Sequence, residues 1–274
     1  MRIDAYGIVF ADMDGTFLAT DKSVPAANLR LLDELVARNI PFVPCTGRPI
    51  SGIPEELLAH PATKYAVGAN GAVIVDVASG KNLREAHMDK EQVLKLYDLV
   101  CNLRVTFDVF TEKGVFAERE RYEAMSNYGL DPHLLAVLRR VRQPLDLTVP
   151  EIVESADMVV KVTSFWSTEQ DREGLRAALE QLEGVSVTNG DPRDYEIQAL
   201  GASKGAALRW LCSYAQIPME SSVAFGDQGN DIPLLEAAGD GVAMANADEL
   251  VRAKARHVTC SCDEAGVARY LLSE

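Results

Sequence analysis

The sequence predicts an α/β fold built on a parallel sheet, with a separate α+β module inserted into it. Toward both ends of the chain, short apolar strands alternate with amphipathic helices, which is typical of a parallel sheet covered by helices. The middle of the chain combines hairpins with helices instead, which indicates an α+β module. The 274 residues suffice for two modest domains. We therefore expect a discontinuous core at residues 1–81 and 191–274 and an inserted domain at residues 82–190.

The first part of the chain begins with a strand, a helix and a second strand. Ile8–Ala11 is an apolar run typical of a buried strand. Pro25–Arg38 is predicted to be a helix, because proline suits a first turn and leucines recur on one face. Pro41–Cys45 is the second strand, and shorter strands are expected at Tyr65–Val67 and Ala72–Val75. In such a fold, ligands bind at the carboxyl ends of the strands.

The middle of the chain has a different pattern. Asp89–Leu103 is predicted to be a long amphipathic helix, and Val105–Phe110 with Val115–Glu118 a hairpin around the sequence TEKG. Further elements are expected as helices at Tyr122–Tyr128, Pro132–Val141 and Glu169–Leu182, and as strands at Met158–Trp166 and Val185–Thr188.

The alternation of strands and helices returns near residue 203. A helix is predicted at Lys204–Tyr214, a strand at Ser222–Phe225, a helix at Asp231–Ala238 and a strand at Gly241–Met244. Two more helices are expected, at Ala247–Ala255 and Glu264–Leu272. The return of the first pattern indicates that both outer parts of the chain build one sheet.

Composition excludes several classes of partner. The formal net charge of −14 argues against duplex nucleic acid and anionic membranes. No apolar run reaches the roughly 18 residues of a membrane span, and no signal peptide is recognisable. The five cysteines are scattered, which fits reduced thiols and predicts a cytoplasmic protein. The pair Cys260 and Cys262 lacks the second pair or histidine cluster of a metal site, so a structural role is favoured.

Two carboxylates follow the first strand directly, and they suggest a bound cation. Asp12 and Asp14 stand two positions apart in the stretch IVFADMDGTFL. Two like charges this close repel each other, and each is costly to remove from water. The arrangement is stable if a positive group lies between them.

Other polar groups stand where further strands end or where a helix begins. They are Thr46-Gly47-Arg48, Ser203-Lys204-Gly205, and Gly226-Asp227 with Asn230-Asp231. Clustered carboxylates without histidine or cysteine favour Mg²⁺, and Mg²⁺ with a lysine and a hydroxyl suits a phosphate. One carboxylate can then attack phosphorus. A second, kept protonated by its charged neighbour, can donate a proton to the leaving oxygen and later activate water.

This set of motifs resembles the haloacid dehalogenase (HAD) phosphatase superfamily. DMDGT, TGR, SKG and GDQGND appear in the order of its four motifs. The stretches TGRPISGIPEELL, ANGAVIVD and VAFGDQGNDIPLLEAAGDGVAMANA resemble the Cof-type subfamily more closely, over roughly Ile8–Lys81 and Tyr195–Leu272. The resemblance implies a Rossmann-like HAD core with an inserted α+β cap domain, of class IIB with a C2B cap. Each motif alone also fits an ordinary turn, and their order decides the interpretation.

The resemblance also implies roles for individual residues. Asp12 is expected to be the nucleophile and a Mg²⁺ ligand, and Asp14 the acid and base, with its backbone carbonyl on the metal. Lys204 is expected to bridge the nucleophile and the phosphate. The remaining expected metal ligands are Asp227 and Asp231, and the expected phosphate- or substrate-binding residues are Thr46, Gly47, Arg48, Asn70 and Asn230.

The predicted function is that of a Mg²⁺-dependent phosphatase of small phosphorylated metabolites such as sugar phosphates. The cap is expected to close over the site, to exclude water and to supply specificity. A monomer or a homodimer is expected. Two alternatives stay open: a phosphomutase of the phosphomannomutase kind, which would return the phosphoryl group to the sugar, and a non-catalytic sugar-phosphate sensor.

Overall fold

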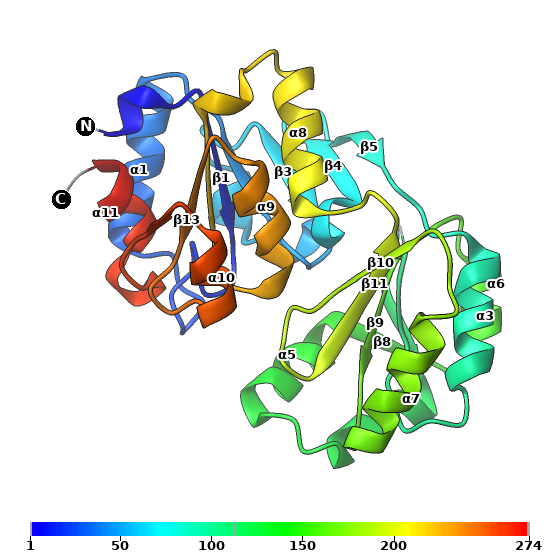
Figure 1. The fold of residues 1–274 in the computed structure, drawn as a ribbon. Coiled ribbons are helices and arrows are strands. Elements are labelled where there is room, and N and C mark those ends of the chain that lie inside the picture. Colours follow the sequence, from blue (N-terminus) through cyan, green and yellow to red (C-terminus); the bar gives the residue numbers. More distant parts are fainter. Residues whose placement is uncertain (1, 112, 273–274) are drawn as a thin grey trace. The chain divides into compact units, whose positions relative to one another are not determined.

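The structure is a computed structural model that describes residues 2–111 and 113–272, and it divides into two compact units (Figure 1). The core unit combines the chain up to Glu85 with the chain from Ala202 onward, and the inserted unit is Ala86–Gly201. The prediction of a mostly parallel α/β fold is confirmed. No helix among the described residues combines the length and the apolar character needed to cross a lipid bilayer.

The described part of the core unit is built on an eight-stranded sheet with the strand order β14-β13-β12-β1-β2-β3-β4-β5. The strands from β14 to β3 are parallel, whereas β4 and β5 are antiparallel additions at one edge. The strands are β1 (Ile8–Asp12), β2 (Phe42–Cys45), β3 (Tyr65–Gly68), β4 (Val73–Asp76), β5 (Lys81–Glu85), β12 (Ser222–Gly226), β13 (Asp240–Ala243) and β14 (His257–Val258).

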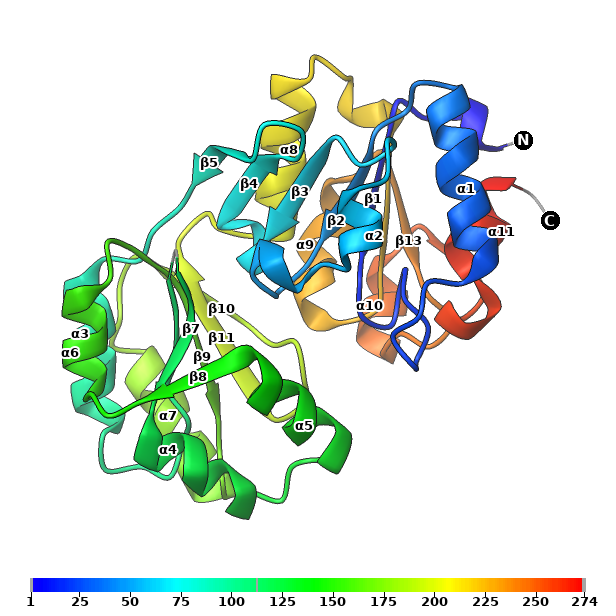
Figure 2. The same cartoon turned by 180° about the vertical axis from the view of Figure 1, so that it is seen from behind.

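Helices cover both faces of this sheet, as Figures 1 and 2 show. α1 and α11 pack together on one face, and α8, α9 and α10 lie on the other. The helices are α1 (Ala26–Ala37), α2 (Glu55–Leu58), α8 (Lys204–Tyr214), α9 (Ile232–Ala237), α10 (Glu249–Lys254) and α11 (Gly266–Leu272). Short 3-10 turns are η1 (Arg2–Ala5), η2 (Ile50–Gly52), η3 (Ala69–Gly71), η5 (Met219–Ser221), η6 (Gly229–Asp231) and η7 (Cys262–Glu264).

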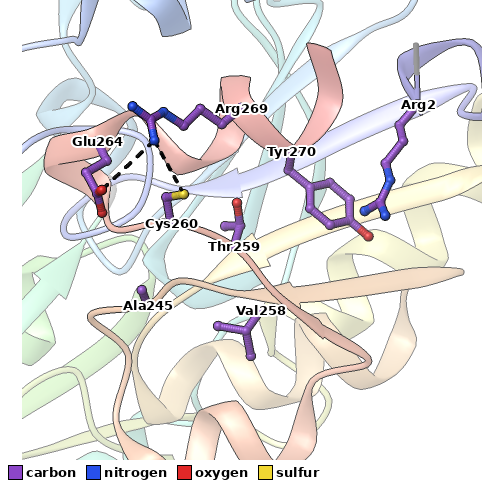
Figure 3. A pocket seen from close by; sticks show the side chains of 8 residues that line it. All are labelled: Arg2, Ala245, Val258, Thr259, Cys260, Glu264, Arg269 and Tyr270. Carbon is purple, nitrogen blue, oxygen red and sulfur yellow. Dashed lines mark hydrogen bonds and ion pairs between the residues drawn. The ribbon is translucent and has the colours of Figure 1, made fainter. Parts of the chain in front are cut away.

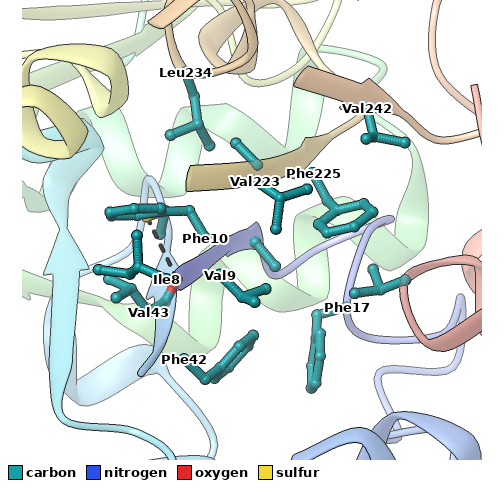
Figure 4. Close-up of a cluster of buried hydrophobic side chains, with 14 of the residues drawn as sticks. Ile8, Val9, Phe10, Phe17, Phe42, Val43, Val223, Phe225, Leu234 and Val242 are labelled. Atoms are coloured by element: carbon teal, nitrogen blue, oxygen red, sulfur yellow. Dashed lines mark hydrogen bonds between the residues drawn. The ribbon is translucent and has the colours of Figure 1, made fainter. Parts of the chain in front are cut away.

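The central strand β1 is buried along its whole length. Its neighbours are β12 and β2, and both of its faces are covered by apolar side chains (Figure 4). The rings of Phe17 and Phe42 lie 4.5 Å apart between their centroids. A strand buried on both faces has no polar alternation, which is why IVFA is continuously apolar. Any polar group at the end of β1 therefore begins inside the protein.

The inserted unit has its own sheet and its own core. Its six described strands have the order β10-β11-β9-β6-β7-β8, antiparallel except for the β7–β8 pair. α3, α6 and α7 cover one face, where Leu96, Ile152 and Leu175 join the apolar cluster. The elements are β6 (Asp108–Thr111), β7 (Gly114–Glu118), β8 (Arg142–Leu145), β9 (Val159–Phe165), β10 (Val185–Thr188), β11 (Asp194–Ala199), α3 (Lys90–Val100), α4 (Arg119–Ala124), η4 (Met125–Asn127), α5 (Pro132–Val141), α6 (Val149–Ser155) and α7 (Glu169–Leu179).

The division between the units differs from the expected boundaries at both junctions. Residues 82–190 were the expected inserted domain, but β5 pairs with β4 and stays in the core unit. At the second junction, β11 pairs with β9 and β10, so residues 191–201 stay in the inserted unit. The polar sequence of β5, KNLRE, has no apolar alternation, so pairing at the sheet edge decides its place rather than burial.

The two-sided burial of the core unit predicts a strong contrast between neighbouring positions of α1. Leu35 is fully buried, whereas the next residue, Val36, is 43% exposed. Leu35→Ala should lower the free energy of unfolding by about 2–5 kcal/mol because it removes packed methyl groups and leaves a cavity. Val36→Ala is the matched control and should change stability by less than about 0.5 kcal/mol. Equal midpoints for the two variants in urea unfolding, followed by circular dichroism, would contradict this packing.

Candidate active site

The candidate site lies at the carboxyl end of β1. Asp12 is the last residue of that strand, and it pairs in register with Cys45 at the end of β2. The neighbouring strand β12 ends at Gly226, directly before Asp227. Because these strands are parallel neighbours, the loops that follow them start at the same edge of the sheet. The polar residues that follow these strands therefore begin at the same edge of the sheet, as a parallel arrangement predicts.

A fully buried lysine joins two of the carboxylates. Nζ of Lys204 lies 2.5 Å from Oδ1 of Asp12 and 2.6 Å from Oδ1 of Asp231. Burial opposes the charge of Lys204, but Asp12 and Asp231 outweigh burial and raise the pKa of the ammonium. Burial raises the pKa of Asp12 well above its usual range, and nearby carboxylates add to the rise while Lys204 opposes it. Lys204 is the first residue of α8, and the Ser203 side chain caps that helix by accepting a hydrogen bond from the N–H of Ala206 (3.1 Å).

Asp231 is held by backbone groups as well as by the lysine. Its Oδ2 accepts hydrogen bonds from the N–H groups of Asp227 (2.9 Å) and Gln228 (3.0 Å). Thr16 donates its hydroxyl to Oδ1 of Asp227 at 2.7 Å. Burial, followed by the charge of Asp231, raises the pKa of Asp227 to about 7. The loop after β12 is therefore tied to the loop after β1 through Thr16.

The donor set fits a hard divalent cation. Asp12, Asp227 and Asp231 are buried, and each offers a carboxylate oxygen within 4.8 Å of the others. Three carboxylates face the single ammonium of Lys204, so the group lacks positive charge. Gly15 has φ +79°, and a Cβ there would lie 2.4 Å from Oδ2 of Asp227. This position must therefore be glycine for the loop to approach the Asp227 carboxylate so closely. Oxygen donors without nitrogen or sulfur match Mg²⁺.

Asp14 lies in a different electrostatic environment from Asp12. Its Oδ1 accepts a hydrogen bond from Nη2 of Arg48 at 2.5 Å and forms an ion pair with Nζ of Lys22 at 2.8 Å. Burial alone would raise the pKa of Asp14, but Arg48 and Lys22 outweigh it and hold the pKa below its usual value. The expectation that a neighbouring charge keeps this carboxyl protonated is therefore wrong for the free protein. The residues nearest to its carboxylate are cations.

The loops after β2 and β3 support each other. Thr46 accepts a hydrogen bond at its Oγ1 from the N–H of Arg48 (3.1 Å) and one at its carbonyl from the N–H of Asn70 (3.0 Å). Gly47 lies between Thr46 and Arg48. Asn230 donates a side-chain hydrogen bond to Oδ1 of Asn70 at 3.2 Å. The structure thus brings all the residues of the sequence-predicted site onto the core unit, in two adjoining groups.

Backbone strain marks the turn that carries Asn70. Ala69, Asn70 and Gly71 all have positive φ, and the first two are not glycine. A Cβ at Gly71 would lie 2.2 Å from the carbonyl oxygen of Ser203, so this turn packs directly against the start of α8. Strained backbone of this kind is found at functional sites, where the surrounding structure holds it in place.

A surface pocket of about 600 Å³ is separate from these carboxylates (Figure 3). Its lining includes Arg2, Cys260, Arg269 and Tyr270, and it contains none of the sequence-predicted site residues. Nη1 of Arg269 lies 3.8 Å from Sγ of Cys260. Neither Cys260 nor Cys262 belongs to the candidate metal group found among the described residues.

Comparison with known proteins decides the family. The family model of haloacid dehalogenase-like hydrolases matches residues 9–271. The chain belongs to the haloacid dehalogenase-like hydrolase family.

Similar proteins indicate which class of reaction this hydrolase catalyses. Phosphatase YwpJ of Bacillus subtilis is 28% identical over 286 residues, covering 96% of this chain and 98% of YwpJ. Pyridoxal phosphate phosphatase YbhA of Escherichia coli is 26% identical, covering 97% of each chain. The solved structure of a HAD subclass IIB sugar phosphatase has a TM-score of 0.82 at 21% identity, covers 97% of this chain and 98% of its own, and shows the shared fold. The chain is a Cof-type HAD phosphatase, that is, a phosphoric monoester hydrolase.

Two residues that contact the site were not among those predicted from the sequence, although one of them had a signal there. Thr16 stands inside the DMDGT motif, and its position there was a signal for a role beside the carboxylates. Lys22 lies outside every motif, its backbone is left-handed with φ 69°, and its ammonium reaches Asp14. A tight turn with a non-glycine residue in this conformation has no reliable sequence signature.

The raised pKa of Asp227 predicts how the stability of the metal-free hydrolase changes with pH. Its folded pKa of about 7 lies above the ordinary 3.8, so between these values the folded protein holds a proton that the unfolded chain has released. Stability therefore falls as pH rises through this window, by at most about 1.4 kcal/mol per pH unit for one group. In EDTA the melting temperature should drop between pH 5 and pH 7, and Asp227→Asn should reduce that drop. Asp98→Asn, at an exposed side chain of the inserted unit, should leave it unchanged.

The same measurement tests whether Mg²⁺ supplies the positive charge that this group of carboxylates lacks. Excess Mg²⁺ at pH 8 should raise the melting temperature of the wild type and have little effect on Asp227→Asn, because a ligand of the folded state stabilises it. Identical pH and Mg²⁺ responses in the two proteins would show that the Asp227 carboxylate neither causes the pH dependence of stability nor contributes to Mg²⁺ binding.

Proposed function

We propose that the chain is a Mg²⁺-dependent phosphatase that hydrolyses small phosphorylated metabolites, sugar phosphates among them, through an aspartyl-phosphate intermediate on Asp12. The observation that carries this proposal is the buried bridge of Lys204 between Asp12 and Asp231, at 2.5 and 2.6 Å, with Asp227 beside it. Such a group is costly to bury, because charges removed from water are stable only when paired. An anionic nucleophile beside a buried cation suits attack on a phosphate.

The proposed metal ligands are Asp12, Asp227 and the backbone carbonyl of Asp14, with Asp231 in or beside the shell. Both oxygens of Asp231 already accept hydrogen bonds from Lys204 and from backbone N–H groups, which favours a supporting role for this residue. Bound Mg²⁺ would supply positive charge that neutralises the phosphoryl oxygens and the carboxylates around them.

The first chemical step takes place on Asp12. A carboxylate oxygen of Asp12 attacks phosphorus, the bond to the ester oxygen breaks, and Asp14 donates a proton to that oxygen, so an alcohol leaves. Lys204 keeps the nucleophile oriented and offers its charge to the phosphoryl group. In the second step, Asp14 takes a proton from water, the oxygen of this water attacks phosphorus, and Asp12 and inorganic phosphate are released.

Asp14 must be protonated for the first step, although Arg48 and Lys22 lower its pKa in the free protein. An arriving phosphate dianion is itself negative and would lie close to this carboxylate. Its charge disfavours the charged carboxylate and would raise the pKa of Asp14 when substrate binds, while Arg48 and Lys22 stay on Oδ1. The free protein then resembles the state that is needed for the second step, in which Asp14 acts as a base.

Other loop residues are proposed to bind the phosphoryl group and its surroundings. Thr46 and the N–H groups around Gly47 would bond phosphoryl oxygens, and Arg48 would contact the substrate from the same loop. Asn70 and Asn230, which bond each other at 3.2 Å, would lie beside it. Their mutual hydrogen bond fixes the loops after β3 and β12 relative to each other.

The inserted unit is proposed to act as the cap that sets specificity. Before α5, Tyr128 packs in an apolar cluster and Asp131 caps the helix, whereas Asn127 is exposed. The identity of the substrate therefore rests on experiment, and YbhA supports including pyridoxal phosphate among the compounds tested. A cytoplasmic location and a monomeric or homodimeric state stay predictions.

Phosphate release tests the proposal directly. The purified protein is assayed with sugar phosphates, FMN, pyridoxal phosphate and p-nitrophenyl phosphate, with Mg²⁺ and with EDTA. Asp12→Asn should lower kcat by at least about a thousandfold, since a nucleophile has no substitute in the site. EDTA should abolish turnover, and Mg²⁺ should restore it. Asp33→Asn serves as the control, with full activity expected.

The outcomes separate the proposal from its alternatives. Turnover that is unaffected by EDTA would contradict the metal dependence, and full activity of Asp12→Asn would contradict the nucleophile. Activity that depends on a sugar bisphosphate and releases little phosphate would identify a mutase. Saturable binding of a sugar phosphate, without turnover by folded, Mg²⁺-loaded protein, would identify a sensor.

A further inference from the structure

Lys22 lies in a short hairpin that follows the β1 loop. The N–H of Ala19 bonds the carbonyl of Ser23 (2.9 Å), and the N–H of Lys22 bonds the carbonyl of Ala19 (2.9 Å). The carboxylate of Asp21 closes the turn by accepting hydrogen bonds from the N–H (2.9 Å) and the hydroxyl (2.6 Å) of Ser23. These bonds hold Lys22 at φ 69°, in the left-handed region that a lysine rarely adopts.

The hairpin is anchored to another part of the core unit. Thr20 donates its N–H and its hydroxyl to the two carboxylate oxygens of Asp263, both at 2.8 Å. Asp263 lies in η7, which begins with a capping box between Ser261 and Glu264. The turn that carries Lys22 is thus held by its own hydrogen bonds and by Thr20, and none of these contacts involves the lysine side chain.

The ammonium of Lys22 contacts the same carboxylate oxygen as the guanidinium of Arg48. Nζ of Lys22 and Nη2 of Arg48 lie 2.8 Å and 2.5 Å from Oδ1 of Asp14. The lysine and aspartate side chains are 35% and 34% exposed, and an ion pair this open to water contributes little to stability. A left-handed lysine costs conformational free energy. Stability alone therefore gives no reason for a lysine at this position.

We propose that Lys22 is a positioning residue that, together with Arg48, fixes Oδ1 of Asp14 and so directs the other oxygen, Oδ2, toward the reacting ester. This inference rests on the proposed phosphatase mechanism, in which Asp14 gives its proton to the leaving oxygen and later takes one from water. Lys22 itself neither gains nor loses a proton. Two cations on one oxygen leave a single free oxygen and a single orientation of the carboxyl group, which is the geometric requirement for efficient proton transfer.

A double-mutant cycle tests whether Lys22 acts through Asp14. The proteins are wild type, Lys22→Met, Asp14→Asn and the double variant, and the measured quantity is kcat/KM for p-nitrophenyl phosphate and for the fastest sugar phosphate. kcat/KM reports the steps up to release of the alcohol, and nitrophenolate leaves well without a proton. Lys22→Met should lower kcat/KM by about tenfold or more with the sugar phosphate, but by less than about threefold with p-nitrophenyl phosphate.

The double variant and the conservative variant complete the test. If Lys22 acts through Asp14, the double variant should be no slower than Asp14→Asn alone. Lys22→Arg, which retains a cation, should keep activity within about threefold of wild type. Multiplying effects in the double variant, or equal losses with both substrates, would overturn the inference while leaving the phosphatase intact. A folded wild type that releases no phosphate from any compound would contradict the proposed function, and with it this inference.

A strain-relieving variant separates positioning from folding. Lys22→Gly removes the charge but suits the left-handed backbone, so its melting temperature should equal or exceed that of wild type while its kcat/KM falls as in Lys22→Met. Gln216 is the matched control, because it is exposed and also left-handed (φ 56°). Gln216→Gly should be at least as stable as wild type and should keep full activity. A Lys22→Gly protein that loses activity only because it unfolds would reduce Lys22 to a structural residue.

Discussion

The structure depends on keeping a group of carboxylates charged at the end of a strand that has no contact with water along its length. β1 is buried on both faces, so Asp12 begins where solvation is already lost. The ammonium of Lys204 supplies a positive charge at 2.5 Å, but it is shared with Asp231, and Asp227 stands beside them. The remaining negative charge can be balanced only by protons or by a cation. The site is therefore built to bind positive charge before it binds anything else.

The chain topology makes this arrangement possible across a large insertion. Lys204 follows Asp12 by 192 positions, and the inserted unit lies between them in the sequence. β1 is central in the core sheet and α8 begins beside the strained turn at Gly71, so both partners belong to the core unit. The insertion leaves the core after the edge strand β5 and returns at Ala202, directly before the helix that carries Lys204. The buried ion pair itself forms between two residues of the core unit.

Sequence patterns predicted the residues of the site that lie at strand ends. They did not predict contacts that depend on the local backbone conformation or on pairing at a sheet edge. Asp12 and Asp227 were predictable because apolar runs end at them, and a parallel sheet gathers such ends at one edge. The polar strand β5 was not predictable from the sequence, because an edge strand needs no alternation of apolar and polar residues. The partners of Asp14 were not predictable either, since Lys22 reaches it through a left-handed turn that leaves no pattern in the sequence.

The two aspartates of the first motif have opposite electrostatic environments although they are two residues apart. Asp12 lies among carboxylates in the interior, where burial raises its pKa, whereas Asp14 meets two cations near the surface, which lower its pKa. A nucleophile needs to be ionised when substrate binds, and positive charge at the Asp12 group would make it so. An acid needs a proton at that moment, and the negative charge of the phosphate beside Asp14 would raise its pKa and let it take one. The same event, the arrival of a metal-bound phosphate, would thus shift both groups in the directions that the reaction requires.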